Sequence, residues 1–156
     1  HSRLAVSLGL HVTALDRDAL ALQGLQGVDG IATVQADIEA DHWRFDDAAV
    51  ATAFDAVIVT NYLHRPLYAQ IAAALAPDGL LIYETFMLGN ARFGRPSNPD
   101  FLLRPDELLT AFPGLSTVAF EQGEVNLPRP AMLQRLCARR AKSAGAKLDT
   151  SARPLR

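Results

Sequence analysis

Short apolar runs recur along the chain, and each of them stops at a polar residue. The clearest runs and their end residues are Val12 to Leu15 before Asp16, Ala32 to Ala36 before Asp37, and Ala56 to Thr60 before Asn61. Runs of this length, separated by helix-length segments, are typical of βαβ units. The parallel strands of such units end at one edge of a sheet, where α/β proteins bind ligands. The pattern therefore predicts an α/β fold with a ligand site at that edge.

The first part of the chain predicts two helices and two strands in alternation. They are a helix that Gly9 ends, a strand over His11 to Leu15, a helix over Ala19 to Leu25 with Asp18 as its cap, and a strand over Ile31 to Ala36. A polar loop with Trp43 should follow, and Asp46 to Thr52 predicts a short helix or turn. Trp43 could line an adenine pocket, but filling the edge of the sheet is the more usual role of a single Trp.

The middle of the chain predicts a strand, a helix and a second strand. Residues Phe54 to Thr60 are almost continuously apolar, as expected for a central strand that helices cover on both faces. Pro66 suits the first turn of a helix to about Ala76. The sequence Pro77-Asp78-Gly79 should end this helix before a strand over Leu80 to Glu84.

Regular periodicity stops at Thr85 and resumes only after Arg104. Loops of that length in compact domains are usually lids or binding loops. Beyond this loop we expect three elements, namely a helix from Pro105 to Phe112, a strand over about Ser116 to Phe120, and an alternating edge strand over Met132 to Ala138.

Composition narrows the class of protein. The 156 residues, 49% of them hydrophobic, suffice for one domain with a sizeable core, which we place at residues 1–140. Cys137 is alone and the four His residues are scattered, so we predict no disulfide framework and no metal site, and a reducing cytoplasm fits best. No apolar run approaches the roughly 18 residues of a membrane span. The sequence does not predict the oligomeric state.

Positive charge gathers toward the C-terminus. From Arg135 onward seven Lys or Arg residues face only Asp149, a net charge of +6, whereas the whole chain carries −2. Such a tail could bind RNA or an acidic partner. A solvated, frayed terminus explains the same charges, and we expect residues 141–156 to be disordered.

Asp16 and Asp37 carry the candidate ligand chemistry. A carboxylate just past one strand can accept two hydrogen bonds from a ribose diol, and one past the neighbouring strand can accept a bond from the exocyclic amine of adenine. Either Asp alone is more simply explained as the start of a turn or as a helix cap. The two together, at matching strand ends, favour a nucleoside-shaped ligand.

Nicotinamide-dependent reductases also place acidic residues after these strands. Hydride transfer in the common short-chain reductases uses a Tyr whose pKa is lowered by a Lys four positions further on. No Tyr in this chain has that Lys, because the only lysines are Lys142 and Lys147 in the basic tail. A reductase of this type is therefore disfavoured.

Several segments resemble, in order, the successive motifs of class I S-adenosylmethionine-dependent methyltransferases. They are Asp16-Arg17-Asp18, Ala36-Asp37-Ile38-Glu39, Phe54-Asp55-Ala56-Val57-Ile58-Val59 and Leu75-Ala76-Pro77-Asp78-Gly79-Leu80-Leu81. Further segments resemble small bacterial methyltransferases related to tellurite-resistance methyltransferases, namely Asn61-Tyr62-Leu63-His64-Arg65-Pro66-Leu67, Tyr83-Glu84-Thr85-Phe86 and Phe93-Gly94-Arg95-Pro96-Ser97-Asn98-Pro99. The resemblance covers about Ser2 to Arg140. It implies a Rossmann-like, doubly wound, mostly parallel sheet with an antiparallel C-terminal edge strand.

The resemblance implies S-adenosylmethionine as the cofactor and assigns the strand ends to it. The implied ligands are Asp16 at the ribose with Arg17 beside it, Asp37 and Ile38 at the adenine, Asn61 near the sulfonium, and Tyr62 and Leu63 as walls of the site. For Tyr62, packing against the rim of the sheet is a serious alternative.

The reaction that the family catalyses sets modest chemical demands. Methyl transfer from a sulfonium is a direct displacement, so the protein mainly aligns the nucleophile, the methyl carbon and the leaving sulfur. His64 is the candidate base, since its ordinary pKa lies near neutrality, and Tyr62 is the other candidate catalytic residue. His64 just ahead of Pro66 also suits the start of a helix, an interpretation that we favour slightly.

The end of the next strand and the long loop supply the candidate acceptor-binding residues. Glu84 could bind the acceptor or a cation, or could form a salt link to Arg65, Arg92 or Arg95. The other candidates are Phe86, Arg95 and Asn98. The segment from Phe86 to Phe101 could close over the acceptor, although an ordered surface loop held by its prolines would look similar.

The chain also departs from the family pattern. Enzymes of the family carry a first strand and a Gly-rich turn ahead of the first helix, and neither precedes His1-Ser2-Arg3. The resemblance therefore implies a domain without its first strand, which transfers the methyl group of S-adenosylmethionine to an unidentified, small-molecule acceptor. A non-catalytic remnant or binding module of the same fold is the leading alternative. An NAD(P)-dependent oxidoreductase is a distant third.

Overall fold

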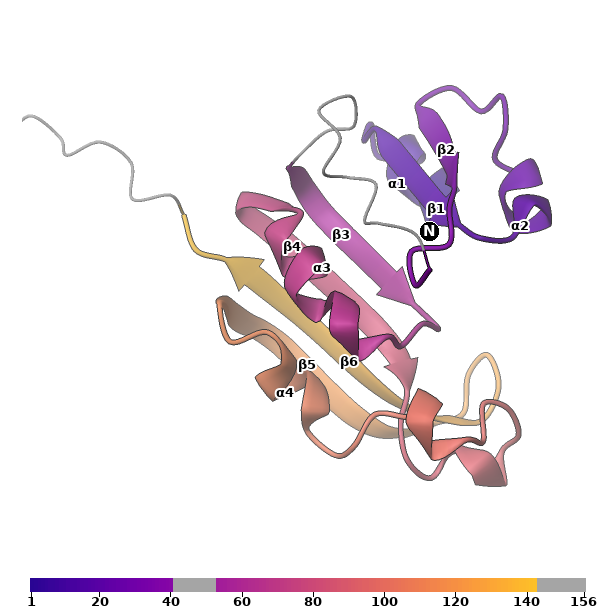
Figure 1. Cartoon of the computed structure of the whole chain (residues 1–156), viewed down its shortest axis with the longest axis vertical. Coiled ribbons are helices and arrows are strands. Elements are labelled where there is room, and N and C mark those ends of the chain that lie inside the picture. Colours follow the sequence, from indigo (N-terminus) through magenta and orange to yellow (C-terminus); the bar gives the residue numbers. More distant parts are fainter. Residues whose placement is uncertain (41–52, 143–156) are drawn as a thin grey trace, which may run out of the picture. The chain divides into compact units, whose positions relative to one another are not determined.

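A computed structural model describes residues 1–40 and 53–142 (Figure 1). The chain divides into two compact units, residues 1–52 and residues 53–156. Our expectations for Trp43, for Asp46 to Thr52 and for the tail beyond residue 142 lie outside the described residues. In the parts of the chain that the structure describes, no helix is both long and apolar enough to cross a membrane.

Within residues 1–40, the first unit has two helices and a two-stranded parallel sheet. Its elements are α1 (Ser2–Ser7), β1 (Val12–Asp16), α2 (Ala19–Gln23) and β2 (Ile31–Gln35). All four predicted elements of this region are confirmed, the first helix by its end near Gly9 and the other three within two residues at each end. Asp18 caps α2 as predicted, because its side chain accepts a hydrogen bond of 2.8 Å from the backbone amide of Leu20. Gly9 follows α1 with a φ of 82°, a left-handed conformation that glycine adopts without strain.

The second unit is built on a four-stranded mixed sheet. The strands, in the spatial order β3-β4-β6-β5, are β3 (Phe54–Thr60), β4 (Leu75–Phe86), β6 (Ala131–Arg140) and β5 (Leu115–Val125). β3 and β4 are parallel, whereas β6 is antiparallel to both of its neighbours. The connecting helices are the 3₁₀ helices η2 (Arg65–Leu67), η3 (Asn90–Arg92) and η4 (Pro99–Phe101) and the α-helices α3 (Tyr68–Ala73) and α4 (Glu107–Ala111).

The core of the second unit lies on one face of this sheet. Along β4, Leu81, Tyr83 and Thr85 are at most 1% exposed, whereas Ile82 between them is 41% exposed. Helices α3 and α4 cover the buried face, where Tyr68 and Phe112 pack their rings on Tyr83 with centroid separations of 6.2 and 5.9 Å (Figure 1). The residues at the end of β4 are therefore presented from a well-packed layer.

A tight turn joins α3 to the regular part of β4. Asp78 has a left-handed φ of 67°. A Cβ on Gly79 would lie 2.8 Å from the carbonyl oxygen of Ala76 and 2.9 Å from that of Phe54. Backbone packs against backbone here, and only a glycine fits at position 79.

Three expectations for this unit need correction. The strand β3 has the predicted bounds, Phe54 to Thr60. It is not a central strand covered on both faces, because it lies at one end of the four-stranded sheet and its Ile58 is 44% exposed. The antiparallel edge of the fold is confirmed, but β5 forms it, and the segment Met132 to Ala138 lies between β4 and β5. The helix that begins near Pro66 ends at Ala73, because Leu75 already pairs with Phe54.

Candidate functional site

Asp16 and Asp37 lie at neighbouring strand ends of the first unit. Asp16 is the last residue of β1 and is paired in register with Gln35, the last residue of β2. The backbone amide of Ala36 then donates a hydrogen bond of 3.1 Å to the carbonyl oxygen of Asp16. The prediction that both carboxylates follow adjacent parallel strands at the same edge is confirmed, and their ligand roles stay predictions.

An open hollow of about 650 Å³ lies at this edge. Its lining residues are Arg17, Asp18, Gln35, Ala36 and Asp37. Gln35 holds the turn after β1, since its amide nitrogen donates a hydrogen bond of 3.3 Å to the carbonyl oxygen of Arg17. Ile38, half-buried, follows directly after the hollow. Of the adenosyl ligands expected from the sequence, Arg17 and Asp37 line the hollow, whereas Asp16 and Ile38 adjoin its lining residues in the chain.

Both carboxylates also stabilise the local backbone. Oδ1 of Asp16 accepts a hydrogen bond of 2.9 Å from the amide of Asp18, and Oδ1 of Asp37 accepts one of 3.0 Å from the amide of Glu39. Each Asp therefore does stabilise a turn, as the simpler interpretation of these residues predicted. It does not compete with ligand binding, because these bonds fix the direction of each carboxylate and use only one of its oxygens.

The chain leaves β3 in an unusual conformation. Asn61 has a left-handed φ of 54°, and its amide donates a hydrogen bond of 2.9 Å to the carbonyl oxygen of Glu84, two residues before the end of β4. Asn tolerates this conformation better than most residues, and departures of this kind gather at functional sites. Asn61 therefore redirects the chain from the sheet into the segment Tyr62 to His64.

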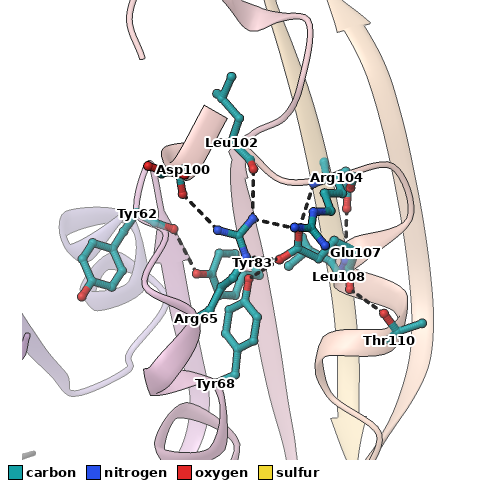
Figure 2. Close-up of polar contacts among 11 residues, drawn as sticks. Tyr62, Arg65, Tyr68, Tyr83, Asp100, Leu102, Arg104, Glu107, Leu108 and Thr110 are labelled. Carbon is teal, nitrogen blue, oxygen red and sulfur yellow. Dashed lines mark hydrogen bonds and ion pairs between the residues drawn. The ribbon is translucent and has the colours of Figure 1, made fainter. Parts of the chain in front are cut away.

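The segment Tyr62 to His64 is held by its backbone. The carbonyl oxygen of Tyr62 accepts a hydrogen bond of 3.0 Å from the Tyr83 hydroxyl, and Figure 2 shows the Tyr62 ring pointing away from that contact. His64 stands at the start of η2, as the structural interpretation of this residue predicted, with no capping bond from its side chain. Leu63, like Tyr62 and His64, is half-buried. Burial raises the pKa of Tyr83, so its hydroxyl stays protonated and remains a donor.

Arg65, the next residue, makes four hydrogen bonds through its guanidinium. Its guanidinium pairs with the Glu107 carboxylate through two hydrogen bonds of 2.7 and 3.0 Å. It also donates to the carbonyl oxygens of Asp100 and Leu102, each at 3.0 Å (Figure 2). Arg65 thus links the segment after β3 to the loop after β4.

Glu107 titrates below its ordinary range in this setting. Its burial alone would raise the pKa, but the hydrogen bonds from Arg65 and from the backbone amide of Arg104 outweigh that effect and lower it. Since the folded pKa lies below the unfolded value, about 4.3, the pair stabilises the fold fully above that value. This contribution is lost as the pH falls through the lower folded pKa.

We therefore expect the stability difference between the wild-type protein and Glu107→Gln to depend on pH. The difference in free energy of unfolding should be largest near pH 7 and should shrink steadily below about pH 4. Urea denaturation at a series of pH values measures it. A difference that is constant from pH 7 to pH 3 would show that the charge of Glu107 contributes nothing.

Glu84 forms a salt link, but with an arginine that the sequence did not indicate. Its Oε2 lies 2.5 Å from Nε of Arg135 on β6, and Arg135 also pairs with Glu121 on β5 at 2.6 Å. These three residues are register neighbours across β4, β6 and β5. The expected partners Arg65 and Arg92 are paired elsewhere, and a role of Glu84 in acceptor or cation binding stays a prediction.

The long loop after β4 is an ordered surface structure. Asn90, 2% exposed, donates a hydrogen bond of 3.0 Å to the carbonyl oxygen of Pro96 and accepts one of 3.1 Å from the amide of Met132. Asn98 begins η4, with its side chain accepting a hydrogen bond from the amide of Asp100 at 3.0 Å. Phe86 is 9% exposed and packs with Leu102, Ala131 and Leu133, so it is a core residue.

Arg95 differs from the other candidates on this loop. It is exposed, and the structure gives its guanidinium no hydrogen-bond or ion-pair partner within residues 53–142. Asn90 fixes the backbone beside it through Pro96. Of the predicted acceptor-binding residues, Arg95 is therefore the one whose charged group is available to a ligand.

Sequence reasoning missed the residues that organise these loops. Arg65 was considered only as a partner of Glu84, and Glu107, Asn90 and Gln134 were not considered. A signal existed for Glu107, because an acidic residue shortly after Pro105 suits the first turn of a helix. No local pattern indicates that it pairs with an arginine 42 residues earlier.

Comparisons with known proteins agree on the fold. No protein-family model and no curated protein sequence matches the chain. Among solved structures, TehB from Haemophilus influenzae matches with a TM-score of 0.64 and 14% identity, over 88% of this chain and 52% of that chain. An S-adenosylmethionine-dependent methyltransferase from Mesorhizobium loti matches with a TM-score of 0.62 and 20% identity, over 88% of this chain and 84% of that chain. The [4+2]-cyclase SpnF matches with a TM-score of 0.65 and 12% identity, over 90% of this chain and 70% of that chain.

These likenesses, at low identity, concern the fold. The chain spans about half the length of the TehB chain. The parallel pairs β1-β2 and β3-β4, together with the antiparallel strands β6 and β5, are consistent with the Rossmann-like expectation. The chain has the fold of the class I S-adenosylmethionine-dependent methyltransferases.

Proposed function

We propose that this chain binds S-adenosylmethionine and transfers its methyl group to a small-molecule acceptor. The observation that carries the proposal is the pair of carboxylates, Asp16 and Asp37, at adjacent ends of parallel strands in a methyltransferase fold. A ribose diol and an adenine amine are hydrogen-bond donors, and two fixed carboxylates are suitable acceptors for them. Asp37 and Arg17, the residue after Asp16, line an open hollow at the same edge of the sheet.

Residues of the second unit supply the proposed acceptor chemistry. Asn61 and the backbone-held segment Tyr62 to His64 follow β3, and Arg95 is the charged group available on the loop after β4. The cofactor supplies an electrophilic methyl group. The chain then has to orient the acceptor, with His64 taking a proton only where the acceptor carries one that must leave.

A second candidate function is binding without methyl transfer. The likeness to a [4+2]-cyclase indicates that this fold is not tied to one reaction. Titration calorimetry with S-adenosylhomocysteine and with NAD separates the ligand classes: an oxidoreductase binds NAD, a remnant of the fold binds neither, and a methyltransferase or a non-catalytic binding module binds the first. Methyl transfer from S-adenosylmethionine to an acceptor then separates the enzyme from the binding module.

We expect Asp16→Ala to weaken binding of S-adenosylhomocysteine by about 1.5 to 3 kcal/mol, the cost of a lost hydrogen bond to a charged group. That corresponds to a rise in Kd of roughly ten- to a hundred-fold. Asp16→Asn should cost less, because an amide oxygen can still accept the bond from Asp18. Calorimetry measures both values.

Asp29→Ala is the matched control for this experiment. Asp29 is an exposed carboxylate of the same unit, and it lies between α2 and β2, before a strand rather than at the end of one. Its replacement should leave the Kd unchanged. Equal affinity of the wild-type protein and Asp16→Ala for S-adenosylhomocysteine would remove Asp16 from the binding site and would contradict the proposal.

A further inference from the structure

Two loops that follow neighbouring strands of the second unit meet at one side chain. The first begins with Asn61 after β3, and the second begins after Phe86 at the end of β4. Arg65 belongs to the first loop, and its guanidinium donates to the carbonyl oxygens of Asp100 and Leu102 in the second. These are backbone acceptors, so the contact fixes the course of the second loop whatever side chains it carries.

Glu107 fixes the direction of the Arg65 guanidinium. The pair is bidentate, with Nε on one carboxylate oxygen and a terminal nitrogen on the other, a geometry that only the planar guanidinium offers. The Glu107 carboxylate also accepts the Tyr68 hydroxyl at 3.3 Å and the Arg104 amide at 2.8 Å. With its side chain only 15% exposed, it is the better-shielded member of the pair.

The sheet in turn fixes the start of helix α4, which carries Glu107. Gln134 on β6 is fully buried, and its amide group accepts a hydrogen bond from the Leu108 amide and donates one to the Arg104 carbonyl. A continuous set of contacts therefore runs from the central strand β6 through α4 and Glu107 to Arg65. Figure 2 shows the part of this set from Arg65 to Leu108 and Thr110.

The segment Tyr62 to His64 lies between two fixed points. Before His64, the carbonyl oxygen of Tyr62 is bound by the buried Tyr83 hydroxyl. After His64, Arg65 is bound to Glu107. The segment therefore has little freedom to move relative to the loop that holds Arg95 and Asn98.

We infer that Arg65, held by Glu107, is a positioning residue for the acceptor side of the site, because it couples the Tyr62 to His64 segment to the loop after β4. This inference rests on the proposed function. Arg65 itself is not a catalytic residue. Four hydrogen bonds to Glu107, Asp100 and Leu102 already occupy its guanidinium, which has five N–H donors.

Arg65→Lys and Glu107→Gln test the coupling by hydrogen–deuterium exchange of the full chain. A lysine keeps the charge and loses the bidentate fork, and a glutamine keeps the shape and loses the charge. Each variant should speed exchange at the Asn61 amide, which is bonded to the Glu84 carbonyl oxygen, and at amides 101–103 together, by ten-fold or more. The acceleration in the double variant should be smaller than the product of the two single accelerations, because both replacements remove the Arg65–Glu107 pair.

Arg92→Lys is the matched control. Arg92 forms an ion pair with Glu124 at 2.5 Å from the same loop, but it contacts neither segment that Arg65 joins. Its replacement should leave exchange at the Asn61 amide unchanged. Faster exchange in Arg65→Lys that is confined to amides 101–103, or that is spread evenly over the whole chain, would contradict the inference that Arg65 couples the two segments.

Methyl transfer to two probe acceptors, selenite and 2-mercaptoethanol, tests the consequence for the site. In Arg65→Lys we expect the KM for the probe that the wild-type protein uses to rise five-fold or more, with the Kd of S-adenosylhomocysteine within two-fold of wild type. An unchanged KM would overturn the positioning role. A wild-type protein that binds no S-adenosylhomocysteine would overturn the proposed function and the positioning role with it, while the exchange data would still decide whether the loops are coupled.

Discussion

Replacing Gly79 by alanine is expected to lower the free energy of unfolding by about 3 kcal/mol or more, at the upper end of the range for overpacked sites. A Cβ at this position would lie within 2.9 Å of two backbone carbonyl oxygens, those of Ala76 and Phe54. Neither oxygen belongs to a flexible side chain, so β3 and β4 would have to separate locally. Urea denaturation followed by circular dichroism measures the loss.

Gly114→Ala is the control for this prediction. A Cβ on Gly114 meets nothing within 4 Å, and its φ lies outside the left-handed range. Alanine should therefore be neutral there, or slightly stabilising because it reduces the conformational freedom of the unfolded chain. Equal stability of Gly79→Ala and Gly114→Ala would show that the tight turn between α3 and β4 is wrongly described.

Gln134→Ala is expected to destabilise the protein by about 4 kcal/mol. The replacement leaves two buried backbone groups without partners, the Leu108 amide and the Arg104 carbonyl, each costing roughly 1 to 3 kcal/mol. It also leaves a cavity beneath α4, because Gln134 is 0% exposed. The shift in the urea midpoint, together with the slope of the transition, measures the effect.

Gln122 offers a close comparison, since it also binds the start of α4. Its side chain accepts a hydrogen bond from the Asp106 amide and donates one to the Asp106 carboxylate, but Gln122 is exposed. Water replaces both bonds when Gln122 is removed, so Gln122→Ala should cost about 1 kcal/mol or less. If the two glutamine variants were equally destabilised, burial of the amide would not be the cause.

The fold was predictable wherever local pattern and tertiary packing agree. The continuous apolar run gives β3 its exact bounds, and the cap at Asp18 marks the start of α2. The strand predicted over Met132 to Ala138 is present, but its prediction as the edge of the sheet was wrong for a specific reason. Gln134 interrupts its apolar pattern and suggests a half-exposed edge, whereas this polar side chain is fully buried and satisfied by the backbone of α4.

The candidate site was predictable only where it depends on strand ends. Asp16 and Asp37 follow directly from two apolar runs, because the parallel register brings both ends to one edge. The link between Arg65 and Glu107 spans 42 residues and depends on how α4 packs against β6. Periodicity, capping and turn signals are local, so they carry no information on such a pair.

The strand order β3-β4-β6-β5 has a consequence for synthesis on the ribosome. β6 is made after β5, yet it separates β5 from β4. A nascent chain that has reached Val125 therefore carries β5 with no neighbouring strand to receive it, and one edge of β4 is exposed as well. Unpaired edges of this kind are prone to aggregate. Slow translation of residues 126–140 would prolong this vulnerable state. Rapid emergence of β6 would shorten it, because β6 pairs with β4 on one side and with β5 on the other.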